Sequence, residues 1–145
     1  MSFPRLAIGL ILMAALPAVP ALAADAPAYT VTQLLSAIAT PSGQPLVMPR
    51  GDVRVMVSTY DIAPGAKLPI HRHPYPRYGY VLAGNLRVTD TDTGQSWDYK
   101  PGDFIVEVVG QWHFGQNTGT TPVKLLVIDV VPKADTRNTM LKPAD

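Results

Sequence analysis

Two short stretches, GAKLPIHRH at residues 65–73 and GQWHFGQN at residues 110–117, contain all three histidines of the chain. His71 and His73 are two residues apart in a segment that we expect to be extended, and alternate residues of a strand share one face. Both imidazoles can therefore point at the same place. His113 lies on a later predicted strand, so a fold that pairs these strands would gather three imidazoles into one site.

Outside these stretches the sequence has the pattern of β-structure. It alternates with a period of two over residues 53–60, and turn signals rich in Gly, Pro, Asn and Asp separate the strand-like runs that follow. These runs cover residues 78–82, 86–91, 96–99, 104–109 and 123–131. Short strands at this spacing indicate one all-β barrel or sandwich over residues 51–131.

The segments on either side of the predicted barrel have different patterns. Leu34, Leu35 and Ile38 have helical spacing, which predicts one short helix over Thr30–Ala39 within an N-terminal lead of residues 24–50. Residues 132–145 are polar with little periodicity. We expect them to form a C-terminal tail that is loosely ordered or wrapped over a neighbour.

Residues 1–23 have the features of a signal peptide. A basic start that contains Arg5 is followed by an apolar run, which ends in the small residues that signal peptidase requires. A membrane anchor would need about 20 apolar residues, and Pro17 and Pro20 interrupt this run. We therefore expect cleavage after Ala23, and a periplasmic or secreted protein without membrane attachment.

Composition narrows the class of protein further. Removing 23 of the 145 residues leaves 122, enough for one domain with its own core. The full chain has 12 Lys and Arg against 11 Asp and Glu, and the loss of Arg5 leaves 11 against 11, which gives no indication of a nucleic-acid partner. Cysteine is absent, so the domain must be held by packing or by metal, and thiol chemistry is excluded.

The glycines around the histidines extend the two stretches into longer patterns. They are G-x5-H-x-H-x3-R-x6-G over residues 65–84 and G-x5-V-x-G-x2-H-x3-N over residues 102–117. Together these patterns resemble the two signature motifs of the cupin superfamily. The resemblance implies a double-stranded β-helix, or jelly-roll, barrel with a site inside its mouth.

The resemblance also implies a metal centre. The residues that match the family's metal ligands are His71, His73 and His113, and neutral imidazoles suit a divalent transition metal such as Fe, Zn, Cu, Ni or Mn. Asn117 matches an asparagine whose expected part is to close a turn. Val108 stands where a proline is usual, which is a minor departure.

Arg77 is the serious departure, because it stands where the motif usually has a metal-binding glutamate. Two unit charges 4 Å apart repel by about 4 kcal/mol at an effective dielectric of 20, and a dication doubles that. Arg77 must then lie at the rim, pair with an anion, or bind an anionic ligand through its planar fork; otherwise the metal is absent. Glu107, the chain's only glutamate, would be a partner for Arg77 if its face of the strand points inward.

Tyr75 lies in the loop between His73 and Arg77 and is the second candidate for contact with a ligand. The alternation sends Tyr78 and Tyr80 to the opposite side, outside the cavity. No residue is identified as a catalytic acid or base, so whether the protein is an enzyme stays open.

Three functions are compatible with these features. The leading hypothesis is an exported metal-binding cupin domain that takes a small, anionic ligand at a three-histidine site. The alternatives are an Fe(II)-dependent cupin dioxygenase acting on a small carboxylate, and a metal-free binding or scaffold barrel. Bare edge strands are adhesive, so a homodimer is also expected.

Overall fold

Nine β-strands form the regular structure of residues 28–144, the part of the chain that the computed structural model describes. Residues 1–27 and 145, and with them the predicted signal peptide, lie outside the described residues. The strands are β1 (Val53–Ile62), β2 (His71–Arg72), β3 (Arg77–Ala83), β4 (Leu86–Asp90), β5 (Ser96–Tyr99), β6 (Phe104–Val106), β7 (His113–Asn117), β8 (Val123–Pro132) and β9 (Met140–Leu141).

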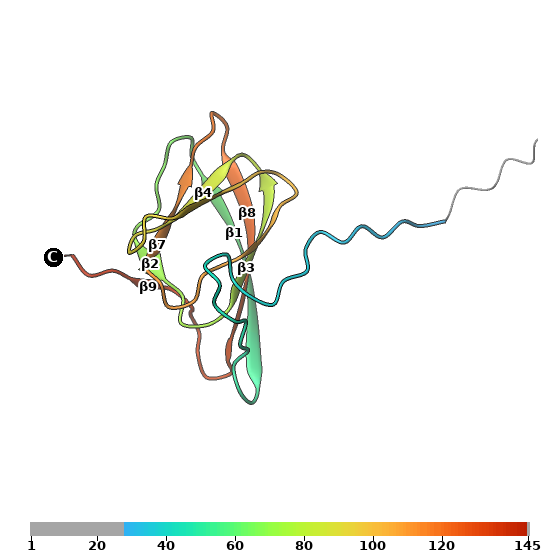
Figure 1. Ribbon diagram of the computed structural model, residues 1–145, viewed down its shortest axis with the longest axis vertical. Helices are drawn as coiled ribbons and strands as arrows, with labels where there is room; N and C mark the ends of the chain where they lie inside the picture. Colours follow the sequence, from blue (N-terminus) through green and yellow to red (C-terminus); the bar gives the residue numbers. More distant parts are fainter. Residues whose placement is uncertain (1–27, 145) are drawn as a thin grey trace, which may run out of the picture. The chain divides into compact units, whose positions relative to one another are not determined.

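The strands form two antiparallel sheets that face each other across a shared interior (Figure 1). The first sheet has the order β1-β8-β3-β6 and the second has the order β5-β4-β7-β2-β9. Neighbours such as β3 and β8 are far apart in sequence, so the barrel depends on long-range pairing. This is the all-β, jelly-roll type of architecture that the motif spacing implies.

The core is made by alternate residues of the strands, as the period of two predicts. Along β8, Val123, Leu125 and Val127 are buried, and Leu86 and Val88 of β4 meet them from the second sheet. Each such side chain contributes about 1.5–3 kcal/mol when fully buried. Leu86, Val88, Leu125 and Val127 also line a cavity together with His71 and His113.

The helix predicted over Thr30–Ala39 is wrong, since the structure contains no helix among residues 28–144. Ile38 is 90% exposed and Leu34 is 58% exposed. A helix of ten residues is marginal in water unless its apolar face is buried, and these side chains remain largely exposed. No helix of the described part of the chain is long and apolar enough to cross a membrane.

Within the predicted tail of residues 132–145, β9 joins the second sheet. β9 pairs with β2, and the Lys142 N–H donates to Ile70 O at 2.9 Å. Asn138 is only 2% exposed. The segment therefore wraps over its own barrel and reaches the histidine-bearing strand.

Two motif residues, Gly84 and Asn117, stabilise turns. Gly84 has a φ of +77°, and a Cβ there would lie 2.6 Å from the carbonyl oxygen of Pro122, so a side chain would clash with the backbone. Asn117 is fully buried, and its Nδ2 donates to Ile62 O at 2.9 Å and to Thr121 O at 2.8 Å. Asn117 thus closes the turn after β7, as the resemblance implies.

Candidate metal centre

The structure brings the three histidines together, as their spacing predicts. His71 lies directly opposite His113 in the pairing of β2 with β7, and His73 follows on the same side of the chain as His71. The ring centroids are 4.5–4.9 Å apart, and one nitrogen from each ring lies within 4.8 Å of the others. All three side chains are buried.

Backbone carbonyl groups fix the orientation of every ring. The Nδ1 atom of His71 lies 2.8 Å from Pro69 O, that of His73 lies 2.7 Å from Asn138 O, and that of His113 lies 2.9 Å from Gln111 O. A carbonyl oxygen only accepts hydrogen bonds, so each Nδ1 must carry the proton. In a neutral ring this leaves the lone pair on Nε2, toward the centre of the cluster.

The cluster fits a transition metal. The Nε2 atoms of His73 and His113 are buried and have no hydrogen-bond partner among the described residues. A buried polar atom without a partner costs about 1–3 kcal/mol, and a divalent ion bound by three imidazole nitrogens would satisfy these atoms. The outer hydrogen bonds to backbone carbonyls are also those of metal-binding histidines in general.

The protonation states of two of the rings also favour metal binding. Burial lowers the pKa of His73 to about 3, and burial likewise lowers the pKa of His71. Both rings are therefore neutral near pH 7 and keep a lone pair for a ligand bond. Burial acts to lower the pKa of His113 as well, but the nearby Glu107 carboxylate outweighs it and raises that pKa.

Glu107 lies just beyond the end of β6 and points into the interior, with 9% of its surface exposed. Its Oε2 is 3.4 Å from Nε2 of His113. Burial acts to raise its pKa, but the interactions with His113, His73 and Arg77 lower it to about 2, so the carboxylate is ionised. The sequence predicts Glu107 as a partner of Arg77 if its face of the strand points inward, and its alternation with the buried Ile105 is the signal that places it inward.

Arg77 is not at the rim, because it is buried with 6% exposure. Its Nε and Nη2 donate to the two carboxylate oxygens of Asp129 at 2.7 and 2.9 Å, and Nη2 also donates to Thr139 at 3.0 Å. Asp129 is the register partner of Arg77 across β3 and β8. It was missed from the sequence, although it shares the inward alternation of Val127 and Val131. Asp129, rather than Glu107, neutralises the arginine.

Tyr75 does not line the cavity, contrary to its selection as a ligand contact. Its backbone N–H donates to the side chain of Asn138, and the nearby Asp135 carboxylate raises the pKa of Tyr75. The ring is thereby held toward the C-terminal segment. Tyr78 and Tyr80, by contrast, lie outside the cavity as the alternation predicted.

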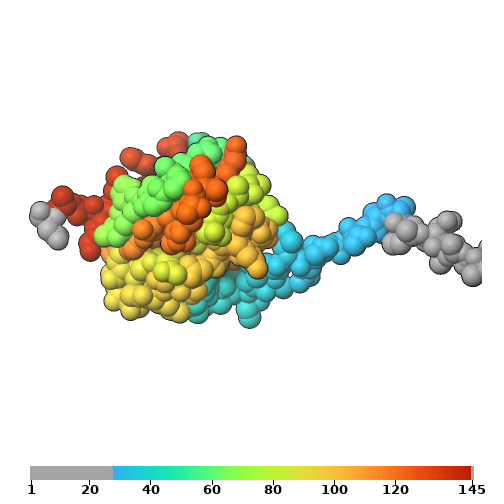
Figure 2. All heavy atoms as spheres, turned by 90° about the horizontal axis from the view of Figure 1, so that it is seen from above, coloured from blue at the N-terminus to red at the C-terminus, as the bar shows by residue number. Residues whose placement is uncertain are grey.

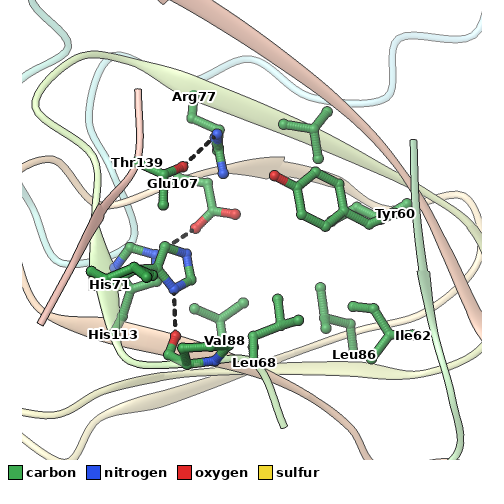
Figure 3. A pocket seen from close by; sticks show the side chains of 15 residues that line it. Tyr60, Ile62, Leu68, His71, Arg77, Leu86, Val88, Glu107, His113 and Thr139 are labelled. Carbon is green, nitrogen blue, oxygen red and sulfur yellow. Dashed lines mark hydrogen bonds and ion pairs between the residues drawn. The ribbon is translucent and has the colours of Figure 1, made fainter. Parts of the chain in front are cut away.

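A cavity of about 160 Å³ lies between the sheets beside the histidines. Its wall is mainly apolar, while imidazole, carboxylate and guanidinium groups gather at one end (Figure 3). The hydroxyl of Tyr60 points toward the space between Arg77 and Glu107 (Figure 3). The apolar wall includes Ile62, Leu68, Leu86, Val88, Leu125 and Val127.

Comparisons with known proteins agree with this architecture. The model of the cupin domain family matches residues 58–129. A protein of Klebsiella pneumoniae with a double-stranded beta-helix domain is 24% identical, with a TM-score of 0.51 over 60% of this chain and 69% of that one. The polyketide cyclase RemF of Streptomyces resistomycificus is 24% identical, with a TM-score of 0.50 over 67% of this chain and 68% of that one.

Oxalate decarboxylase of Lactobacillus farciminis, solved as a formate complex, is 21% identical with a TM-score of 0.52. The alignment covers 60% of this chain but only 26% of the decarboxylase chain. At these identities the similarity concerns the fold. No curated protein matches the chain. The family model, the two-sheet barrel and the three gathered motif histidines show that this chain belongs to the cupin superfamily.

Proposed function

We propose that this chain is an exported cupin in which His71, His73 and His113 hold a divalent transition metal, and in which a small anionic ligand binds beside that metal. The observation that carries the proposal is the orientation of the rings. Each Nδ1 is committed to a backbone carbonyl, so all three Nε2 lone pairs are presented to one interior point.

The cavity supports a small ligand with a polar end. A single water needs about 10–15 Å³ of such space, so 160 Å³ accommodates a molecule of several heavy atoms. A bound metal would supply an electrophilic centre for a ligand oxygen. The Tyr60 hydroxyl can donate to the same ligand, and so can Nη1 of Arg77, which has no partner among the described residues.

An anion is the ligand that this polar end favours. The Arg77–Asp129 pair is neutral as a whole, so the positive charge of the metal would decide the preference, and Arg77 would add a directional donor. The formate complex of the Lactobacillus farciminis decarboxylase gives one example of a small carboxylate in a protein of similar fold. The apolar wall would contact the rest of the ligand and keep water away.

Elemental analysis of the exported protein tests this proposal. The protein, purified from the periplasm or the medium without chelator or affinity tag, should begin at Ala24 by mass and contain close to one transition-metal ion per chain. The double variant His71→Ala, His73→Ala should lose the metal. Arg72→Ala is the matched control, because this residue lies between the two histidines but stacks on Trp112 instead. Metal absent from the wild type, even after reconstitution, would leave the metal-free barrel as the function.

An Fe(II)-dependent dioxygenase is the second candidate, favoured by the apolar wall next to the histidines. Such a wall excludes bulk water from the reacting atoms. Oxygen consumption by the iron-loaded protein, measured with a panel of small carboxylates, separates the two functions. A binding protein gives none, whereas a dioxygenase consumes oxygen only with its substrate.

A further inference from the structure

We propose that Glu107 is a fourth protein ligand of the metal centre, and that it replaces, from the neighbouring strand, the carboxylate that Arg77 displaces from the usual motif position. The inference rests on the proposed metal-binding function. It concerns a residue outside the motif pattern, on the other sheet from the histidines.

The distance between the two groups fits a shared ion. Oε2 of Glu107 lies 3.4 Å from Nε2 of His113. Ligand atoms about 2.1 Å from one metal ion lie roughly 3.0 Å apart at 90° and roughly 3.4 Å apart at a tetrahedral angle. The carboxylate is therefore already at the separation that two ligands of one ion require.

The atom that faces Glu107 favours a role as a ligand over a merely supporting role. A carboxylate that orients a metal-binding histidine bonds the ring nitrogen remote from the metal, and in His113 that nitrogen is taken by Gln111 O. Glu107 instead faces Nε2, the metal-binding atom. Once Nε2 gives its lone pair to a metal it can no longer carry a proton, and Glu107 would be a buried charge without a partner unless it binds the ion too.

Arg77 does not bond Oε2 of Glu107. Two guanidinium nitrogens of Arg77 are bonded to Asp129 and Thr139, and Oε2 of Glu107 has no hydrogen-bond partner in the described part of the chain. Asp129 of β8 forms an ion pair with Arg77 and cancels its charge. Three neutral imidazoles and one carboxylate would then reduce the charge of a divalent centre from +2 to +1.

The backbone pairing explains how either of two neighbouring strands could supply the carboxylate. The Glu107 N–H donates to Arg77 O at 3.0 Å, so the two residues are adjacent across the continuation of the β3–β6 pairing. Both side chains point inward toward the same cavity. A carboxylate at either position would therefore enter the same cavity as His71 and His113, and this chain places it at position 107.

The substitution Glu107→Gln tests the proposal, because it keeps the size of the side chain and removes its charge. Full-length mature protein is stripped of metal, and its affinity for Zn²⁺ and Co²⁺ is measured by competition with a chromogenic chelator. We expect the affinity to fall at least about tenfold, and the Co²⁺ absorption bands to change in position and intensity. Asp98→Asn, which removes one charge from an exposed ion pair far from the site, is the control.

A difference infrared spectrum of the wild type, with and without Zn²⁺, gives a second readout that depends on no variant's folding. A carboxylate stretching band should shift on metal addition. Wild type that binds no metal would overturn the proposed function itself. Wild type that binds metal with no shifted carboxylate band, or a Glu107→Gln protein with unchanged affinity and Co²⁺ spectrum, would overturn the assignment of Glu107 alone.

Discussion

Arg77 and Asp129 form an ion pair whose side chains are each only 7% exposed. Such a pair loses its hydration, and its mutual attraction must compensate that loss. Asn138 adds a further hydrogen bond of 2.8 Å to the same Asp129 oxygen that accepts from Nε of Arg77. The pair thus keeps a positive charge beside the three-histidine cluster without leaving it uncompensated.

Substituting Asp129→Asn should therefore destabilise the protein by about 3–5 kcal/mol, because it leaves the guanidinium buried without its counter-charge. Chemical denaturation of metal-free protein measures this. Metal affinity should fall as well, since Arg77 would then repel the ion. The double variant Arg77→Met, Asp129→Leu should regain most of the lost stability; a double variant as unstable as Asp129→Asn would contradict the charge argument.

At this scale the sequence predicts residues that follow strand alternation or the motif spacing, and it misses pairs that depend only on strand register. His71 and His73 share a face because of strand alternation. Asn117 closes the turn that directly follows its own strand, β7. Arg77 and Asp129 are 52 positions apart, and their pairing depends on the register of β3 with β8. Tyr75 was chosen for its nearness in sequence to the histidines, yet its loop turns it toward Asp135.

Among the elements, the C-terminal segment of residues 133–144 has a larger part than its composition suggests. Asn138 is buried, its carbonyl oxygen holds the ring of His73, and its side chain bonds Tyr75 and Asp129. β9 then pairs with the edge of β2. The histidine strand is therefore held between β7 and the end of the chain.

We expect Asn138→Ala to loosen this segment, because Asp129 loses a buried hydrogen bond and the carbonyl of Tyr75 loses a partly buried one. Each lost partner costs about 1–3 kcal/mol. Limited proteolysis should cut within residues 133–144 faster than in the wild type, and metal should dissociate faster. Equal cleavage rates in variant and wild type would show that β9 alone holds the segment.

The two terminal segments also show what periodicity can and cannot predict. Helical spacing at residues 34–38 shows only that apolar side chains would share a face, and the fold offers that face no helix-packing surface; Leu34 and Leu35 instead line a groove with Tyr78 and Phe104. The sequence of the C-terminal segment shows no periodicity, because single side chains and one short strand hold it in place. Hydrophobic periodicity therefore predicts the barrel strands but not how the two terminal segments contact the barrel.

In the whole molecule, the first sheet leaves part of its outer face uncovered. Val53, Val55 and Val57 of β1 are 45%, 58% and 60% exposed. β1 and β8 lie side by side on the surface (Figure 2), and β1 is an edge of ten residues with no further strand beside it in the described structure. An antiparallel edge can pair with its own copy about a twofold axis, so a second copy of this chain is the occupant we expect.

The protein should accordingly be a dimer by light scattering coupled to size-exclusion chromatography. The variant Val55→Asp, Val57→Asp should shift it to a monomer, because two carboxylates per chain would have to be buried at the interface. Thr118→Asp, Thr120→Asp adds the same charge on an exposed turn and should remain a dimer. A wild type that is monomeric at every concentration would refute this interface.

The bond between Asn138 and His73 has a consequence for the order of folding events. Pro69 and Gln111 lie two positions from the rings that their carbonyls hold, whereas Asn138 lies 65 positions from His73. Until that long-range contact forms, the His73 ring lacks the carbonyl that fixes its proton on Nδ1. His73 is then the last of the three rings to be oriented, and it waits for the C-terminal segment to fold against the barrel.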